Sequence, residues 1–151
     1  MPLDVRAATL SDLAVICEFN AALARESEGK TLDPALLTPG VEAVLRDPQK
    51  GCYFLAREAG VVLGQLSVTL EWSDWRNGWF WWIQSVYVRT EARRRGVFRA
   101  LFHHVHTSAI SDQQVIGIRL YVEHDNHAAQ RTYQALGLVR TTYQVMERYP
   151  L

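Results

Sequence analysis

The chain has 151 residues, of which 48% are apolar and 21% charged. This length predicts one soluble globular domain over residues 1–151, and no apolar run is long enough to cross a bilayer. Sixteen basic residues balance sixteen acidic ones, which argues against nucleic acid or a membrane surface as a partner. No cationic stretch followed by an apolar one opens the chain, so a cytoplasmic location is expected.

The first predicted elements are a strand and two helices. Residues 3–7 predict the strand, and Thr9-Leu10-Ser11-Asp12 has the form of a capping box that begins a helix ending at about Arg25. A second helix is predicted to begin at Thr38-Pro39, because proline is favoured in the first turn, and to stop before Pro48. Both helices are expected to cover one face of a sheet.

A hairpin and a long apolar strand follow. Residues 52–58 and 61–71 are predicted strands joined by the turn Ala59-Gly60. After a tryptophan-rich loop at 72–78, residues 79–88 are apolar almost throughout, which is typical of a strand covered on both faces. This strand is therefore expected to be central.

The rest of the chain alternates helices and strands. Helices are predicted at 96–109 and 126–136, the second closed by Gly137. Strands are predicted at 115–123 and 139–148. Strands linked by helical crossovers predict a mixed α/β fold.

A basic turn, Arg93-Arg94-Arg95-Gly96, joins the central strand to the helix at 96–109. The first N–H groups of a helix have no partner inside it, and the helix dipole adds partial positive charge there. Gly96 would let the main chain come close to a diphosphate, and the arginines would supply fork-shaped donors. Taken alone, however, three arginines and one glycine are more typical of a solvated turn.

The turn resembles the acetyl-CoA signature of the GNAT acetyltransferase superfamily, Arg/Gln-x-x-Gly-x-Gly/Ala after Val-x-Pro. Val88, Arg93 and Gly96 match this signature, whereas Thr90 replaces its proline and Phe98 its last small residue. The departure at Phe98 bears on how closely the backbone approaches the phosphates. Phe98 belongs to a helical apolar stripe, with Leu101, Phe102, Val105 and Ala109, that is expected to face the sheet.

A second segment is similar to the same family's Asn-x-x-Ala-x-x-x-Tyr-x-x-x-Gly-Phe pattern. Asn126, Ala129, Tyr133 and Gly137 match, and Leu138 replaces the phenylalanine. Asn126 is a good N-cap, and Asn126, Ala129 and Tyr133 share one helix face. Without the arginine turn, Tyr133 would be more typical of a core tyrosine.

The resemblance implies a GNAT-like, mainly antiparallel sheet of about six to seven strands flanked by about four helices. It implies acetyl-CoA as cosubstrate and assigns Tyr133 to the sulfur, where a phenol of pKa about 10 can protonate a thiolate whose own pKa is about 8.5. A strand N–H near Ser85 or Val86 would meet the acyl oxygen. The residues expected at the cosubstrate are Val86, Tyr87, Val88, Arg93, Arg94, Arg95, Gly96, Val97, Phe98, Arg99, Asn126, Ala129 and Tyr133.

The acceptor amine, with a pKa of about 10.4, must lose a proton before it attacks. Glu71, Asp74 and Glu123 are candidate bases, and Glu71 is taken as the catalytic one, although a solvated hairpin end explains Glu71 and Asp74 equally well. The residues expected at the acceptor are Glu71, Trp72, Asp74, Trp75 and Gln84.

Direct attack in a ternary complex is favoured over a covalent enzyme intermediate, because Cys17 and Cys52 lie outside both motifs. The strand at 79–88 is weakly similar to the spermidine/spermine and thialysine acetyltransferase branch, but Gln84 and Ser85 stand where that branch has an acidic pair.

The function expected is therefore acetyl transfer to the amine of a small molecule. A protein or peptide N-acetyltransferase and a catalytically silent acyl-CoA-binding module are the alternatives. No metal is expected, since His103, His104 and His106 are better explained as surface histidines. The resemblance also allows a homodimer.

Overall fold

The computed structural model describes residues 2–151. They belong to two compact units, Met1–Leu120 and Tyr121–Leu151, called here the larger and the smaller unit. None of the helices in residues 2–151 is both long and apolar enough to span a membrane.

The larger unit is built on one five-stranded sheet with the order β1-β2-β3-β4-β5. Strands β1 to β4 pair antiparallel and β5 pairs parallel with β4, so the predicted central strand does lie inside the sheet. The strands are β1 Asp4–Ala7, β2 Cys52–Glu58, β3 Val61–Ser73, β4 Gly78–Val88 and β5 Val115–Leu120.

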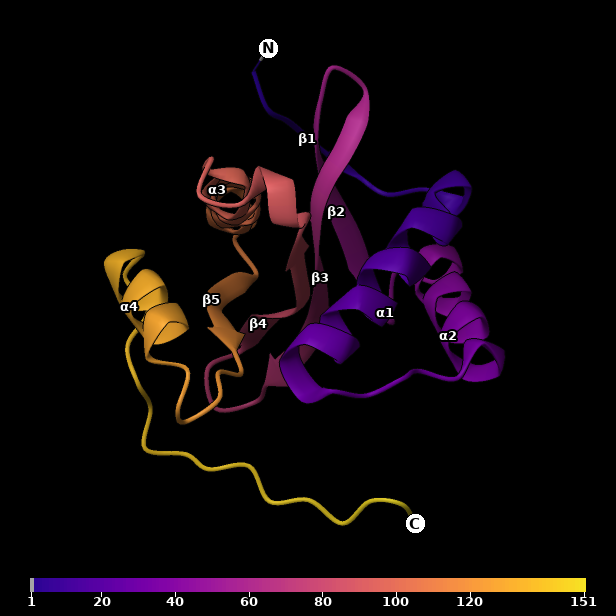
Figure 1. Cartoon of the computed structure of the whole chain (residues 1–151). Coiled ribbons are helices and arrows are strands. Elements are labelled where there is room, and N and C mark those ends of the chain that lie inside the picture. The colour runs from indigo at the N-terminus through magenta and orange to yellow at the C-terminus, as the bar shows by residue number, and fades with distance from the viewer. Residues whose placement is uncertain (1) are drawn as a thin grey trace. The chain divides into compact units, whose positions relative to one another are not determined.

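Helices cover both faces of this sheet. The helices of the larger unit are α1 Leu13–Glu28, α2 Pro34–Arg46 and α3 Val97–Ser111. Figure 1 shows α1 and α2 on one side of the sheet and α3 on the other. The buried side chains on the first side are centred on Ile16, Val41, Tyr53 and Leu55. Those of α3 are Val97, Leu101, Phe102, Val105 and Ala109.

The capping box before α1 is confirmed. The Thr9 N–H donates to Asp12 Oδ2 at 2.7 Å, and Arg6 donates to both oxygens of Asp12 at 2.8 and 2.9 Å. The hydrogen bond from the Arg6 guanidinium holds the pKa of the Asp12 carboxyl below its ordinary value. The helix then runs past the predicted end at Arg25 and closes at Gly29, whose φ is +62°.

The second helix begins earlier than predicted. It starts at Pro34, and Pro39 lies inside it. Proline alone does not determine a helix start. Asp33 Oδ1 accepts from the Ala35 N–H at 2.9 Å and so caps the helix, which favours Pro34 as its first residue.

The predicted hairpin of β2 and β3 is confirmed. Its turn residues Ala59 and Gly60 have φ of +50° and +79°, as a tight type I′ turn requires. The next loop is shorter than predicted, because β3 runs on to Ser73 and Trp72 pairs with Trp79.

The N-terminal end of α3 packs closely on β3 at Gly64. A Cβ atom at Gly64 would lie 2.8 Å from Val97 Cγ1 and 3.0 Å from the Tyr87 carbonyl oxygen. Only glycine allows this approach of helix and strand.

The smaller unit contains helix α4, His127–Ala135. Asn126 Oδ1 accepts from the Ala129 N–H at 3.1 Å, as expected of an N-cap. At the other end Gly137 has a φ of +93°, and the Leu138 N–H donates to the Tyr133 carbonyl at 3.0 Å. This pattern closes the helix as predicted.

The prediction of a strand at 139–148 is wrong, and β5 ends at Leu120 instead of residue 123. The sheet of the described chain therefore has five strands, and the six to seven expected are not confirmed. Alternating apolar residues form a strand only where a neighbouring strand supplies hydrogen bonds. Here Tyr143 and Val145 stay 69% and 70% exposed, and the Tyr143 N–H donates to the Thr141 hydroxyl.

Candidate functional site

The arginine turn, Arg93–Gly96, contains two residues with a left-handed backbone. Arg94 has a φ of +63° and Gly96 a φ of +81°, and α3 begins at the next residue. A Cβ atom at Gly96 would have no atom within 4 Å, so the surface above the main chain is open. The turn therefore presents the start of a 15-residue helix to solvent, where an anion is favoured.

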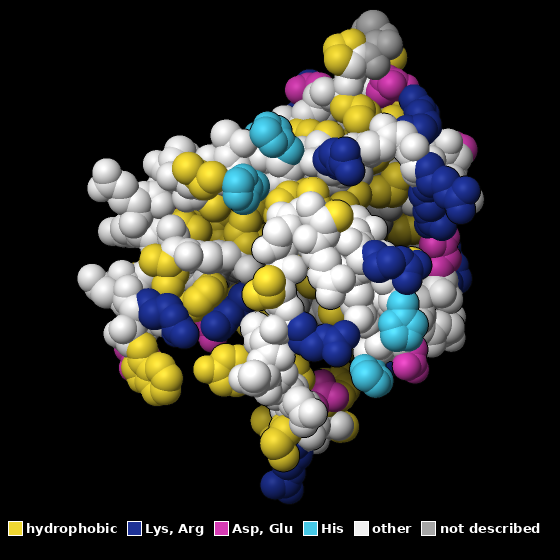
Figure 2. Space-filling model, turned by 90° about the vertical axis from the view of Figure 1, so that its left-hand side faces the viewer, with side chains coloured by type: hydrophobic (Ala, Val, Ile, Leu, Met, Phe, Trp, Pro, Cys, Tyr) yellow, Lys and Arg dark blue, Asp and Glu magenta, His cyan; other side chains and the backbone are white. Residues whose placement is uncertain are grey.

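Two arginine side chains of this turn are bound by glutamates. Arg93 Nη2 donates to Glu26 Oε2 and Arg95 Nη2 donates to Glu58 Oε2, both at 2.6 Å. Arg93 also donates through Nε to the Val88 carbonyl at 3.0 Å. Figure 2 shows Lys and Arg side chains gathered along the upper right-hand edge of the face in view. These carboxylates offset the charge of Arg93 and Arg95, which leaves the open main chain at Gly96 and the exposed Arg94 as candidate contacts for an anion.

The predicted stripe on α3 is confirmed for four of its positions. Leu101, Phe102, Val105 and Ala109 are buried, whereas Phe98 is half-buried with its ring 6.2 Å from that of Phe102. The bulky side chain of Phe98 thus contacts its own helix, and Gly96 stays open beside it.

Strand β4 carries a bulge in its second half. Gln65 pairs with Tyr87 and Ser67 with Gln84, so two β4 residues, Ser85 and Val86, stand opposite one residue of β3. Ser85 has a φ of +53°, which is rare outside glycine. The last register pair of β4 with β5 is at Ile83, so the bulge lies beyond the parallel pairing.

Buried polar side chains support this bulge. Gln65 Nε2 donates to the Ser85 carbonyl at 3.0 Å and to Asn20 Oδ1 at 3.1 Å. Asn20 Nδ2 in turn donates to the Tyr53 hydroxyl at 3.1 Å, and Ser67 Oγ donates to the Gln84 carbonyl at 3.1 Å. A chain of hydrogen bonds thus links β2, α1, β3 and the bulge.

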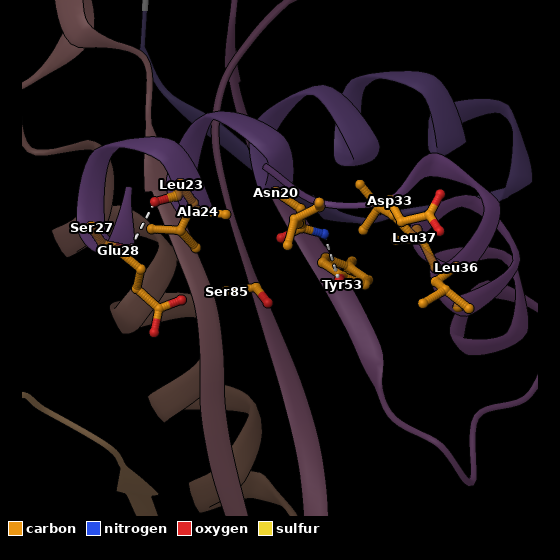
Figure 3. A pocket seen from close by; sticks show the side chains of 13 residues that line it. Asn20, Leu23, Ala24, Ser27, Glu28, Asp33, Leu36, Leu37, Tyr53 and Ser85 are labelled. Atoms are coloured by element: carbon orange, nitrogen blue, oxygen red, sulfur yellow. Dashed lines mark hydrogen bonds between the residues drawn. The ribbon is translucent and has the colours of Figure 1, made fainter. Parts of the chain in front are cut away.

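A pocket of about 570 Å³ opens beside this chain, between α1, α2 and the sheet. Figure 3 shows the Asn20–Tyr53 hydrogen bond in it, with Glu28 from α1 and Ser85 from β4. The described lining includes two carboxylates, Glu28 and Asp33, and no lysine, arginine or histidine. The lining residues are Asn20, Leu23, Ala24, Ser27, Glu28, Leu32, Asp33, Leu36, Leu37, Gly40, Val41, Tyr53 and Ser85.

Sequence reasoning missed this α1–α2 pocket. Its residues come from four separate segments, and each has an ordinary explanation in isolation. Two signals were present: Asn20 stands on the buried face of a helix, and Gln65 interrupts the apolar run of β3. Buried polar residues of this kind require partners, and such partners often gather at a site.

The residues predicted to bind the acceptor lie elsewhere in the larger unit, and the described pocket lining includes none of them. Glu71 Oε1 accepts from Arg119 Nη1 at 2.9 Å and from Trp82 Nε1 at 3.1 Å. Asp74 Oδ1 accepts from the Trp75 N–H. The Trp72 ring packs edge-on against Trp79, and Gln84 donates to Thr69.

Tyr133 belongs to the smaller unit, on α4 with Ala129, and Asn126 caps the same helix. Burial raises the pKa of its phenol above the ordinary value of 10.0, so it is protonated throughout the neutral range. In the same unit, the backbone carbonyl of Glu123 accepts a hydrogen bond from Gln130 Nε2 at 3.0 Å.

Known proteins resemble this chain over nearly its whole length. The model described as the Acetyltransferase (GNAT) family matches residues 16–138. A possible acetyltransferase from Clostridium difficile 630 is 43% identical, with a TM-score of 0.93 over 100% of this chain and 99% of that one. The ribosomal-protein-alanine N-acetyltransferase from Brucella melitensis biovar Abortus 2308 shares the fold alone, at 15% identity and a TM-score of 0.80 over 99% and 100% of the two chains. No curated protein matches the chain.

Proposed function

The chain belongs to the Acetyltransferase (GNAT) family, and from this premise we propose that it transfers an acetyl group from acetyl-CoA to the amine of a small molecule. The observation that carries the choice of acceptor is the α1–α2 pocket. Its volume of about 570 Å³ suits a small ligand, and its lining includes Ser85 of the bulged strand. An amine arrives protonated at neutral pH, and the carboxylates of Glu28 and Asp33 favour a cation.

The residues of the arginine turn fit the proposed cosubstrate. Open space above Gly96 admits a diphosphate against the main chain, and the dipole of α3 favours its negative charge. When bound, acetyl-CoA supplies an acetyl group already activated as a thioester. The exposed Arg94 and Arg99 lie on either side of Gly96 and add positive charge.

Proton movements are assigned to residues of this chain. Tyr133 is the proposed donor to the leaving sulfur, because burial keeps its phenol protonated. Glu71 is the base proposed from the sequence; since it lies outside the described lining of the α1–α2 pocket, water would carry the proton to it, and the bonds from Arg119 and Trp82 fix its carboxylate. Glu28, which lines the pocket, is a further candidate base in addition to Asp74 and Glu123. The pH dependence of kcat for Glu71→Gln and for Glu28→Gln would distinguish these bases, since only loss of the true base abolishes the fall of kcat at low pH, the acidic limb.

A thiol-release assay tests the proposed activity. Polyamines, amino acids, aminoglycosides and peptides are offered with acetyl-CoA, first to the wild type and then to Tyr133→Phe. We expect the wild type to release free CoA thiol with at least one small amine. In Tyr133→Phe we expect kcat to fall roughly 10²-fold or more, as is usual when a general acid is lost. Full turnover in that variant would refute the acid role.

The same assay separates the alternatives. Release with peptides and none with small amines would make the chain a peptide N-acetyltransferase. Binding of acetyl-CoA without release by any acceptor would make it a silent acyl-CoA-binding module.

We also propose that the protein is a homodimer. The support is the C-terminal segment of the smaller unit, where Val139, Met146 and Tyr149 are 82%, 95% and 83% exposed. Apolar side chains exposed to this degree favour association. Light scattering of the full chain and of a chain ending at Leu138 tests this, with a dimer expected only for the full chain.

A further inference from the structure

The carbonyl groups of the β4 bulge are bound by side chains of β3. Gln65 donates to the Ser85 carbonyl and Ser67 to the Gln84 carbonyl. Gln65 is fully buried and Ser67 is 6% exposed, so water does not compete for these bonds. The extra residue of the bulge thus replaces main-chain pairing with two side-chain hydrogen bonds.

These bonds also determine where two backbone N–H groups point. In a planar trans peptide the C=O and the N–H of the next residue point in opposite directions. Because Gln65 holds the Ser85 carbonyl, the Val86 N–H points away from Gln65. In the same way Ser67 turns the Ser85 N–H away from itself.

Gln65 is itself fixed by a second bond. One hydrogen of its amide goes to Ser85 and the other to Asn20, and Asn20 is held by the Tyr53 hydroxyl. Its Oε1 has no partner among the described residues. A buried oxygen without a partner is costly, so stability alone does not explain a glutamine at this position.

We propose that Gln65 is a positioning residue that aims the Val86 N–H at the carbonyl oxygen of the bound acyl group, with Ser67 doing the same for the Ser85 N–H. This inference rests on the proposed function. Gln65 touches no reacting atom, and its effect passes through the peptide plane between Ser85 and Val86.

The decisive variant is Gln65→Met, which keeps the length of the side chain and removes both donors. We expect kcat to fall roughly 10- to 100-fold, somewhat less than the loss usual when an oxyanion donor is removed outright. The KM for acetyl-CoA is expected to stay within about threefold, because the phosphates bind at the turn. The midpoint of thermal unfolding should also fall, because the Ser85 carbonyl and Asn20 Oδ1 lose their donor, and a control of similar stability is therefore needed.

Val68→Ala is the matched control. Val68 is a buried β3 residue with 1% exposure. Its truncation leaves a cavity but removes neither hydrogen bond to the bulge carbonyls, which come from Gln65 and Ser67. It should lower the unfolding midpoint and leave kcat within about twofold. If Gln65→Met does not fold, Ser67→Ala replaces it, with a smaller fall in kcat expected because only the Ser85 amide is released.

An NMR spectrum of the backbone amides gives a second readout that does not depend on turnover. In the wild type the Val86 amide proton should shift more with acetyl-CoA than with CoA, because only the former carries the acyl oxygen, and Gln65→Met should abolish the difference. If the difference is present and abolished but no amine is acetylated, the positioning role stands and the proposed function falls. The inference is overturned if the wild type shows no such difference, or if folded Gln65→Met retains it together with full kcat.

Discussion

The arginine turn and the α1–α2 pocket are built in opposite ways. The turn is one continuous segment that presents its main chain, while Arg93 and Arg95 are bound by Glu26 and Glu58. The pocket presents side chains from α1, α2, β2 and β4. The comparison teaches that the backbone conformation should govern the affinity of the turn, whereas the selectivity of the pocket should depend on individual side chains.

Gly96→Asp should break the turn most severely. It adds a negative side chain in the open space above the main chain and strains a residue whose φ is +81°. We expect the affinity for acetyl-CoA to fall by about tenfold or more, as measured by calorimetry. Gly96→Asn is the control, because asparagine tolerates this φ without adding charge. An unchanged affinity in Gly96→Asp would remove the turn from the site.

Glu28→Gln should act on the pocket alone. The Glu28 carboxylate lines the pocket and has a single long ion pair, 4.0 Å from Lys30 Nζ. We expect the KM for a cationic acceptor to rise about 3- to 10-fold, with the acetyl-CoA affinity unchanged. Glu42→Gln is the matched control, since Glu42 lies on α2 and pairs with Arg46. Equal effects of the two substitutions would mean that the pocket does not select the acceptor.

Arg93→Ala should have the smallest effect. Its guanidinium is already bound by Glu26 and the Val88 carbonyl and lies 5.6 Å from the Tyr87 ring centroid. We expect a loss of acetyl-CoA affinity of only about two- to threefold at physiological salt. Calorimetry at two salt concentrations measures it. A tenfold loss would show that the arginine side chain, and not the main chain, carries the binding.

The parts of the fold that could be predicted are those with strong local signals. The hairpin followed from Ala59-Gly60 between two apolar runs, and α3 from its apolar stripe. The start of α2 was missed because two prolines compete for it, and the cap at Asp33 favours the earlier one. The segment at 139–148 has the pattern of a strand, but a pattern does not supply a pairing partner.

The arginine turn could be predicted from local sequence, and the α1–α2 pocket could not. The arginine turn is contiguous, so its residue types and spacing are visible together. The pocket brings Asn20, Tyr53 and Ser85 together from distant parts of the chain. Only the fold brings these residues together. The isolated polar residue Gln65 inside an apolar strand was a sequence signal near them, since it donates to both Asn20 and Ser85.

Gly64 couples the interior of the sheet to the proposed anion site at the start of α3. The first residue of α3 rests on this glycine with no space for a methyl group, so in Gly64→Ala either the Val97 side chain or the start of the helix must shift. Where the start of the helix shifts, the amides that follow Gly96 move with it. Ligand affinity at the surface can therefore be adjusted from beneath, by a residue that never meets the ligand.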